Sequence, residues 1–104
     1  MSETDIQREI LAQLALMPGV FVWRQNSGAM KVGRRYIKFG LTGQADISGL
    51  LQGGRRLEIE VKTKAGVLSL EQVAFGARIN ALGGLWFVAR SVDEAIAKVK
   101  EALV

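Results

Sequence analysis

Residues 46–62 read DISGLLQGGRRLEIEVK, in which the pair Gly53–Gly54 separates two apolar segments. In the second segment, residues 56–62, apolar and charged residues alternate strictly. This period of two predicts a strand with an apolar face turned toward a core and a charged face on the other side. The glycines favour a tight hairpin, so we expect antiparallel strands over residues 45–51 and 55–62.

The charged face of the second strand carries Glu60 and Lys62 two positions apart. Side chains with that spacing are about 6.6 Å apart, which suits a carboxylate that holds a metal ion and an ammonium group that reaches the reacting water. If Asp46 pairs with Glu60 across the hairpin, both carboxylates lie on this face, whereas a two-residue turn pairs Asp46 with Val61 instead. We therefore predict a turn of odd length or a bulge, and a shared acidic site.

The whole chain predicts a single α/β domain over residues 1–104, a mixed β-sheet flanked by helices in the order αββββαβα. The expected elements are a helix over 3–17, strands over 20–24 and 35–39, the two hairpin strands, a helix over 69–82, a strand over 85–89 and a helix after Ser91.

Local signals add the connections between these elements. Asn26-Ser27-Gly28 predicts a turn, after which the strand at 35–39 is expected to pair with the strand at 20–24. Thr4-x-x-Gln7 and Ser69-x-x-Gln72 match the capping box that opens a helix. The crossover from the second hairpin strand to the apolar strand at 85–89 is expected to be parallel and right-handed.

Composition limits the chemistry. The chain of 104 residues is 49% apolar with one proline, which is typical of a compact domain near the lower size limit for a stable core, so a homodimer would help. It has no cysteine and no histidine, so catalysis would depend on carboxylates, lysine and a metal ion. The acidic start MSETD and the lack of a long apolar run favour a soluble, cytoplasmic protein of a bacterium or phage-infected cell.

Positive charge is concentrated in one region. The net charge is +4, and no acidic residue occurs between Glu9 and Asp46. The basic residues of this region, with one that follows the acidic motif, are Arg24, Lys31, Arg34, Arg35, Lys38 and Lys64. They predict a face that binds nucleic-acid phosphates, and the alternative is that they are solvated surface charges.

Asp46 followed by Glu60-Val61-Lys62 resembles the signature of PD-(D/E)XK nucleases, and the order of elements resembles their restriction-endonuclease-like core. The VRR-NUC branch of that superfamily is the closer resemblance. It rests on four motifs that span nearly the whole chain: GQADI at 43–47, IEVKT at 59–63, Leu68-Ser69-x-x-Gln72, and Gly83-Gly84 before an apolar strand. Ala45 stands where the superfamily signature has proline.

The resemblance implies a divalent-metal-dependent endonuclease. Asp46, Glu60 and the backbone carbonyl of Val61 would bind Mg²⁺ or Mn²⁺, the hard cations that oxygen ligands favour. Lys62 would orient the nucleophile or offset charge on the phosphate. Gln72 would position water, substrate or Lys62.

Two further implications concern the first helix and the substrate. Glu9 resembles the helix glutamate that assists the metal site in some members of the family. Stand-alone members resemble structure-selective enzymes, and dimeric ones act on branched DNA such as a four-way junction or a flap. Phosphate and shape readout fit a chain with no separate recognition module.

Each assignment has a plainer alternative. Gln72 is also the expected capping partner of Ser69, and Glu9 also fits an exposed helix position. The aromatic residues Trp23, Trp86 and Phe87 and the acid Glu58 are expected in structural roles, the acid beside an arginine. Two other function classes remain open: a nuclease-fold protein that binds nucleic acid without cutting it, and a basic interaction module with structural carboxylates.

Overall fold

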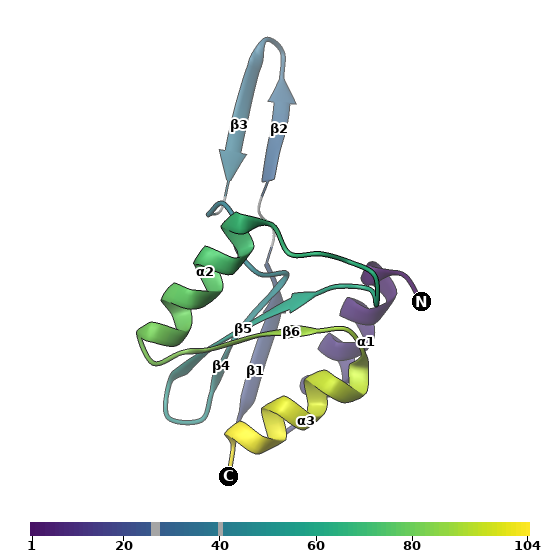
Figure 1. Cartoon of the computed structure of the whole chain (residues 1–104), viewed down its shortest axis with the longest axis vertical. Coiled ribbons are helices and arrows are strands. Elements are labelled where there is room, and N and C mark those ends of the chain that lie inside the picture. The colour runs from purple at the N-terminus through teal and green to yellow at the C-terminus, as the bar shows by residue number, and fades with distance from the viewer. Residues whose placement is uncertain (26–27, 40) are drawn as a thin grey trace.

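The computed structural model describes residues 1–25, 28–39 and 41–104, so Asn26 and Ser27 of the expected turn lie outside the described residues. The elements are α1 (Glu3–Leu14), β1 (Val20–Arg24), β2 (Gly28–Val32), β3 (Arg35–Phe39), β4 (Ile47–Leu51), β5 (Arg55–Val61), α2 (Leu70–Ala81), β6 (Leu85–Ala89) and α3 (Val92–Ala102). The mixed α/β class is confirmed, and β2 is a strand that the sequence analysis missed (Figure 1).

Four strands form the main sheet in the order β1-β4-β5-β6. β1 is antiparallel to β4, β4 is antiparallel to β5, and β5 is parallel to β6. The predicted hairpin and the predicted parallel crossover through α2 are therefore confirmed. Leu51 pairs with Arg55, so the turn has the odd length that we expected, and Gly53 and Gly54 adopt positive φ angles of 91° and 87° that glycine tolerates best.

The predicted pairing of residues 35–39 with residues 20–24 is wrong. β3 pairs with β2 in a separate two-stranded ribbon, and β1 pairs with β4. The reason is local, because Val32 pairs with Arg35 across a two-residue turn in which Gly33 has a φ of 63°, as the first position of a type II′ turn requires. This ribbon projects from the rest of the molecule, whose principal extents are 49 × 32 × 23 Å (Figure 1).

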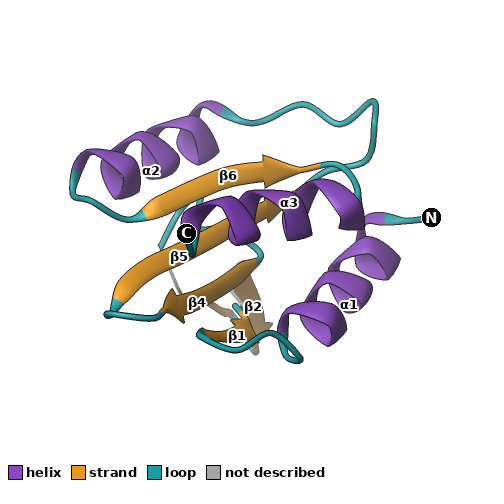
Figure 2. Cartoon of the chain, turned by 90° about the horizontal axis from the view of Figure 1, so that it is seen from below, coloured by secondary structure: helices purple, strands orange, loops and turns teal. Residues whose placement is uncertain are grey.

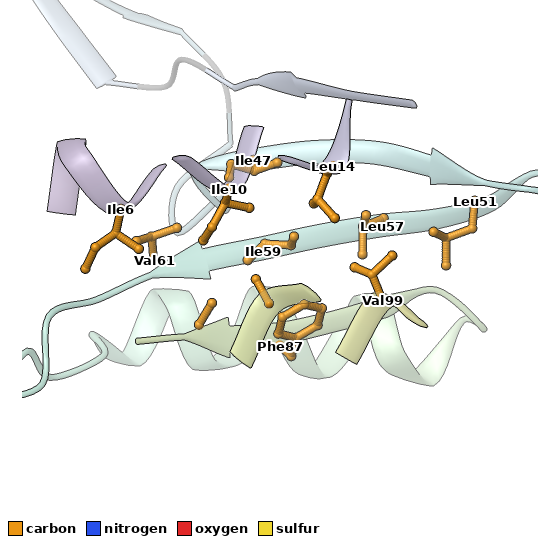
Figure 3. Packing of buried hydrophobic residues seen from close by; sticks show 12 residues of the cluster. Ile6, Ile10, Leu14, Ile47, Leu51, Leu57, Ile59, Val61, Phe87 and Val99 are labelled. Carbon is orange, nitrogen blue, oxygen red and sulfur yellow. The ribbon is translucent and has the colours of Figure 1, made fainter. Parts of the chain in front are cut away.

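One face of the sheet packs against α1 and α3. The buried apolar residues of this core are Ile6, Ile10, Leu14, Ile47, Leu51, Leu57, Ile59, Val61, Phe87, Ala89, Ala95 and Val99 (Figure 3). The alternation along β5 is the predicted one, with its apolar residues on the core side, so its acidic residues lie on the opposite face.

The opposite face is covered by α2 on the side of β6 (Figure 2). Gly76 of α2 is buried, and a β-carbon at this position would overlap the indole ring of Trp86. This close approach also leaves the Nε1 of Trp86 buried with no hydrogen-bond partner. The β1 side of the same face is open, where Phe21 is 64% exposed.

The start of α1 differs from the prediction. Its capping box consists of Ser2 and Asp5 rather than Thr4 and Gln7, with both reciprocal hydrogen bonds at 3.1 Å. The helix also ends at Leu14, earlier than expected, because a proline at 18 disfavours helical backbone before it. In the described ranges, no helix is long and apolar enough to cross a membrane.

Candidate functional site

Asp46 and Glu60 meet at the end of the β4–β5 hairpin. The register pairs Ile47 with Ile59, so one more step places Asp46 opposite Glu60 on the face that points away from the core. The backbone N–H of Val61 donates a hydrogen bond of 2.8 Å to Oδ2 of Asp46, which holds this carboxylate against the end of β5. The prediction of two carboxylates on one face is therefore confirmed.

Glu60 is held in an environment that disfavours its charge. Its side chain is 2% exposed, and its Oε1 is buried with no hydrogen-bond partner. Burial, followed by the hydrogen bond and the negative charge of Asp46, raises the pKa of Glu60 to about 9. Glu60 of the free protein therefore keeps its proton at neutral pH, and a divalent cation beside the two carboxyl groups would supply positive charge in its place.

Glu3 is the acid of α1 whose charge acts on Glu60. This charge raises the pKa of Glu60, whereas Glu9 lies at an exposed position of the helix. Glu3 was not identified from the sequence, although its spacing from the buried Ile6 and Ile10 places it near the face of α1 that turns toward the sheet. That helical phase was the signal that could have identified it.

Lys62 follows Glu60 at the end of β5. Its positive charge lowers the pKa of Glu60, whereas burial, the larger effect, raises it. The ammonium group of Lys62 therefore acts on the carboxylate site. Its backbone N–H donates to the carbonyl of Ala89 at 3.1 Å, and a β-carbon at Gly66 would lie 3.2 Å from the Cδ of Lys62. The aliphatic part of Lys62 is therefore packed against the loop that follows it.

Arg90 anchors that loop and was not identified from the sequence. Its Nη1 donates to the carbonyl oxygens of Thr63 at 2.8 Å and Gly66 at 2.7 Å. Because the loop carries the residues that pack on Lys62, the guanidinium group fixes the surroundings of the lysine. A single arginine after an apolar strand gives no sequence signal for such a role.

Gln72 has the capping role that was one of its two interpretations. Its Oε1 accepts from the backbone N–H of Ser69 at 2.8 Å, and the Oγ of Ser69 accepts from the N–H of Gln72 at 3.1 Å. The first turn of α2 is nevertheless close to the acidic motif, because a β-carbon at Gly43 would overlap the carbonyl of Glu71. Gly43, with a φ of 80°, lets the chain that leads into Asp46 pass against this helix end.

A second buried acid, Glu58, has full pairing. Its Oε2 accepts from the Oγ of Ser48 and its Oε1 from the Nε of Arg56, each at 2.8 Å, as expected for a carboxylate beside an arginine. Arg56 also lies 5.4 Å from the ring centroid of Trp23. Glu58 is therefore structural, and among the described residues the only buried carboxylate oxygen without a hydrogen-bond partner is Oε1 of Glu60.

The predicted basic residues fall into two groups. Arg34 and Arg35 are exposed at the end of the β2–β3 ribbon, and Lys31 and Lys38 belong to its two strands. The second group flanks the acidic site, with Arg24 exposed at the end of β1 and Lys64 exposed in the loop after Lys62.

The donor set fits a hard divalent cation. Two carboxylates and the backbone carbonyl at Val61 are oxygen ligands, and the chain has no thiol or imidazole to favour zinc. Within residues 1–25, 28–39 and 41–104 no group of three or more Asp or Glu side chains forms a metal cage, so substrate phosphate and water would have to complete the coordination.

A groove of about 510 Å³ also lies along α2, with Leu41, Phe75 and Ile79 in its lining. It contains neither Asp46 nor Glu60, so it is separate from the acidic site. A comparison of the chain with models of known protein families finds no match, and a search among curated proteins finds none either.

Proposed function

We propose that this protein is a Mg²⁺- or Mn²⁺-dependent endonuclease that hydrolyses DNA phosphodiester bonds. The observation that carries the proposal is the Asp46–Glu60 pair, which has a buried, unpartnered oxygen on Glu60 and the charge of Lys62 beside it. Burying a carboxylate beside a second carboxylate costs free energy unless a proton or a cation offsets the charge, and a strongly perturbed carboxylate in such a place is typical of a functional site.

The residues divide the work as follows. Asp46 and Glu60, with the Val61 carbonyl, hold the divalent cation, and Lys62 offsets the negative charge that develops on the scissile phosphate. The cation, when bound, supplies Lewis-acid polarisation of the phosphate and activation of water. Glu3 adds negative charge to the site, and Gln72 holds the start of α2 in place beside the acidic motif.

The substrate and the assembly are part of the same proposal. The chain acts as a VRR-NUC-type nuclease with a restriction-endonuclease-like core on branched DNA, a four-way junction or a flap, and works as a homodimer. Exposed Phe21 and Leu50 on the open side of the sheet offer apolar surface for a second copy. The cations Arg24 and Lys64 beside the acids favour a phosphate-bearing substrate.

The test is cleavage of labelled junction, flap, single-stranded and duplex DNA in Mg²⁺ or Mn²⁺. Asp46→Ala, Glu60→Ala and Lys62→Ala should each abolish cutting while DNA binding is largely retained, and Lys98→Ala, which removes an exposed lysine from α3, should cut as the wild type does. Full activity in any of the first three variants would refute the assigned roles.

Calorimetric titration with Mn²⁺ distinguishes a metal-dependent nuclease from the main alternative, a protein of this fold that binds nucleic acid without cutting it. The wild-type protein should bind the ion and Glu60→Ala should not. DNA binding without any metal binding or cleavage would instead identify a non-catalytic nucleic-acid-binding module with this fold.

A further inference from the structure

The β2–β3 ribbon is set apart from the rest of the fold. Its strands pair with each other and with no strand of the main sheet among the described residues. It extends along the longest dimension of the molecule, away from the helices (Figure 1). An isolated two-stranded hairpin is marginally stable in water, so such a ribbon gains stability from a bound partner.

The charge of the ribbon identifies the chemistry of that partner. Residues 28–39 contain four basic residues and no acidic residue. The two-residue turn brings Arg34 and Arg35 to the far end, where both are exposed, and the register places Lys31 opposite Tyr36 and Ala29 opposite Lys38. A narrow ribbon of one charge sign fits a polyanion, and the major groove of duplex DNA has the width to admit a two-stranded ribbon.

The residues that flank the ribbon in the chain lie close to the acidic site. Arg24 pairs with Ile47 at the end of the β1–β4 ladder, and the N–H of Gln25 donates to the carbonyl of Asp46 at 2.8 Å. On the return side, the N–H of Gln44 donates to the carbonyl of Leu41 at 3.0 Å just before the acidic motif. The described residues that flank the ribbon are therefore beside the acidic motif, Gln25 through its hydrogen bond and Gln44 two positions before Asp46.

The length of the ribbon gives its reach. Each strand of five residues spans about 17 Å, so the ribbon itself is as long as the axial rise of roughly five base pairs of B-DNA.

We propose that the β2–β3 ribbon is an arm that enters a groove of double-stranded DNA beside the cleavage point, with Arg34 and Arg35 at its far end on backbone phosphates. The inference rests on the proposed function in taking DNA as the substrate, and it adds that the substrate must be duplex on one side of the cut. Single-stranded DNA would offer no groove to the arm.

The experiment compares wild type, Arg34→Ala/Arg35→Ala and the matched control Lys98→Ala/Lys100→Ala, which removes the same charge from exposed positions of α3. Duplex binding without divalent cation is measured over a range of salt concentrations. Loss of two phosphate contacts should reduce the slope of log K against log salt by about 1.8, and the control should keep the wild-type slope. Thermal unfolding confirms that each variant is folded, and Arg34→Gln/Arg35→Gln replaces the alanine variant if it is not.

A second experiment tests where Arg34 and Arg35 contact the DNA. Neutral methylphosphonates are placed in successive blocks along the duplex that flanks the cut, and one block should weaken binding of wild type while leaving the arginine variant unaffected. Two results would overturn the inference even if the wild type cuts DNA. One is an equal salt slope for wild type and the arginine variant on duplex DNA. The other is a loss of binding in the arginine variant that is as large on single-stranded DNA as on duplex DNA. Arm-dependent duplex binding without cleavage would support the arm and refute the proposed nuclease function.

Discussion

The N–H of Val61 donates to Oδ2 of Asp46 at 2.8 Å, so a carboxylate of the candidate metal site also closes the end of the β4–β5 hairpin. Val61 is fully buried, and its N–H would lose this acceptor in Asp46→Ala. We expect Asp46→Ala to lower the free energy of unfolding by about 1–3 kcal/mol, the cost of an unsatisfied buried donor. Asp46→Asn keeps an acceptor oxygen and should remain near wild-type stability, yet both variants should lose Mn²⁺ binding. Denaturant unfolding and calorimetry measure the two effects separately, and equal stability of the two variants would contradict the hydrogen-bond role.

The pH dependence of stability follows from Glu60. The unfolded chain loses this proton near pH 4.5 and the folded chain near pH 9, so the folded state binds more protons between these values. The free energy of unfolding of the metal-free protein should therefore fall as the pH rises through that window. Glu60→Gln should flatten this dependence and add about 2 kcal/mol or more at pH 8, since one pKa unit corresponds to about 1.4 kcal/mol. Denaturant unfolding from pH 5 to 9 tests this, with Glu9→Gln as the control that should keep the wild-type slope.

Removal of the Glu3 charge should weaken cation binding. Glu3 lies in the first turn of α1 and its charge acts on Glu60, so Glu3→Gln should lower Mn²⁺ affinity by about threefold, as expected for a partly screened charge. Glu9→Gln removes the same charge from an exposed position of the same helix and should leave the affinity unchanged. Calorimetric titration of both variants distinguishes the two glutamates, and a larger effect at Glu9 would restore the assignment made from the family resemblance.

Gly43 should be intolerant of a side chain. In Gly43→Ala the new β-carbon overlaps the carbonyl of Glu71 and the φ of 80° is unfavourable, so we expect a loss of about 2–4 kcal/mol and a displaced start of α2. Gly53→Ala is the matched control, because Gly53 has a φ of 91° and nothing within 4 Å of a new β-carbon. The control should cost about 1 kcal/mol. Equal losses in chemical denaturation would show that the backbone angle, and not the contact with α2, explains the glycine.

Arg90 should affect activity through the loop that packs on Lys62. Arg90→Met removes the donors to Thr63 and Gly66, so the loop beside Lys62 should loosen, with a loss of about 1–2 kcal/mol and a fall in kcat. Arg8→Met removes an exposed arginine whose ion pair with Asp5 is 3.6 Å long and should change little. Steady-state cleavage kinetics measure the effect, and an unchanged kcat in a destabilised Arg90→Met would limit this arginine to a structural role.

Periodicity predicted the part of the fold that forms the candidate site. The alternation in residues 56–62 and the glycine turn before it predicted the position of the strand and the facing of its side chains. The register was predicted from the condition that Asp46 lies opposite Glu60, and one buried face makes a slip of one residue costly. The missed strand, Gly28–Val32, has glycine, alanine, methionine and lysine in a row, which are weak strand formers. Its pairing comes from the turn at Gly33–Arg34, a signal that hydrophobic patterning does not contain.

The choice of acid on α1 shows a similar limit. Motif order favoured Glu9, whereas the side of the helix that faces the sheet depends on where the helix begins and on its phase. Ser2 and Asp5 set that beginning, whereas Thr4 and Gln7 were predicted to do so. Contacts such as Arg90 with the loop at 63–66 join segments far apart in the chain, so no local pattern announces them.

The two ends of the chain differ in how close they lie to the candidate site. Leu103 lies near Gly19, since a β-carbon there would be 3.7 Å from its Cδ2 and 3.0 Å from Oε1 of Gln52, which follows β4 at the turn remote from Glu60. Figure 1 likewise places the carboxyl terminus at the opposite extremity from the ribbon. Immobilisation on a bead or fusion to a reporter through that terminus would leave the approach of a large polymer unobstructed, whereas a tag ahead of Ser2 would crowd the helix turn that carries Glu3.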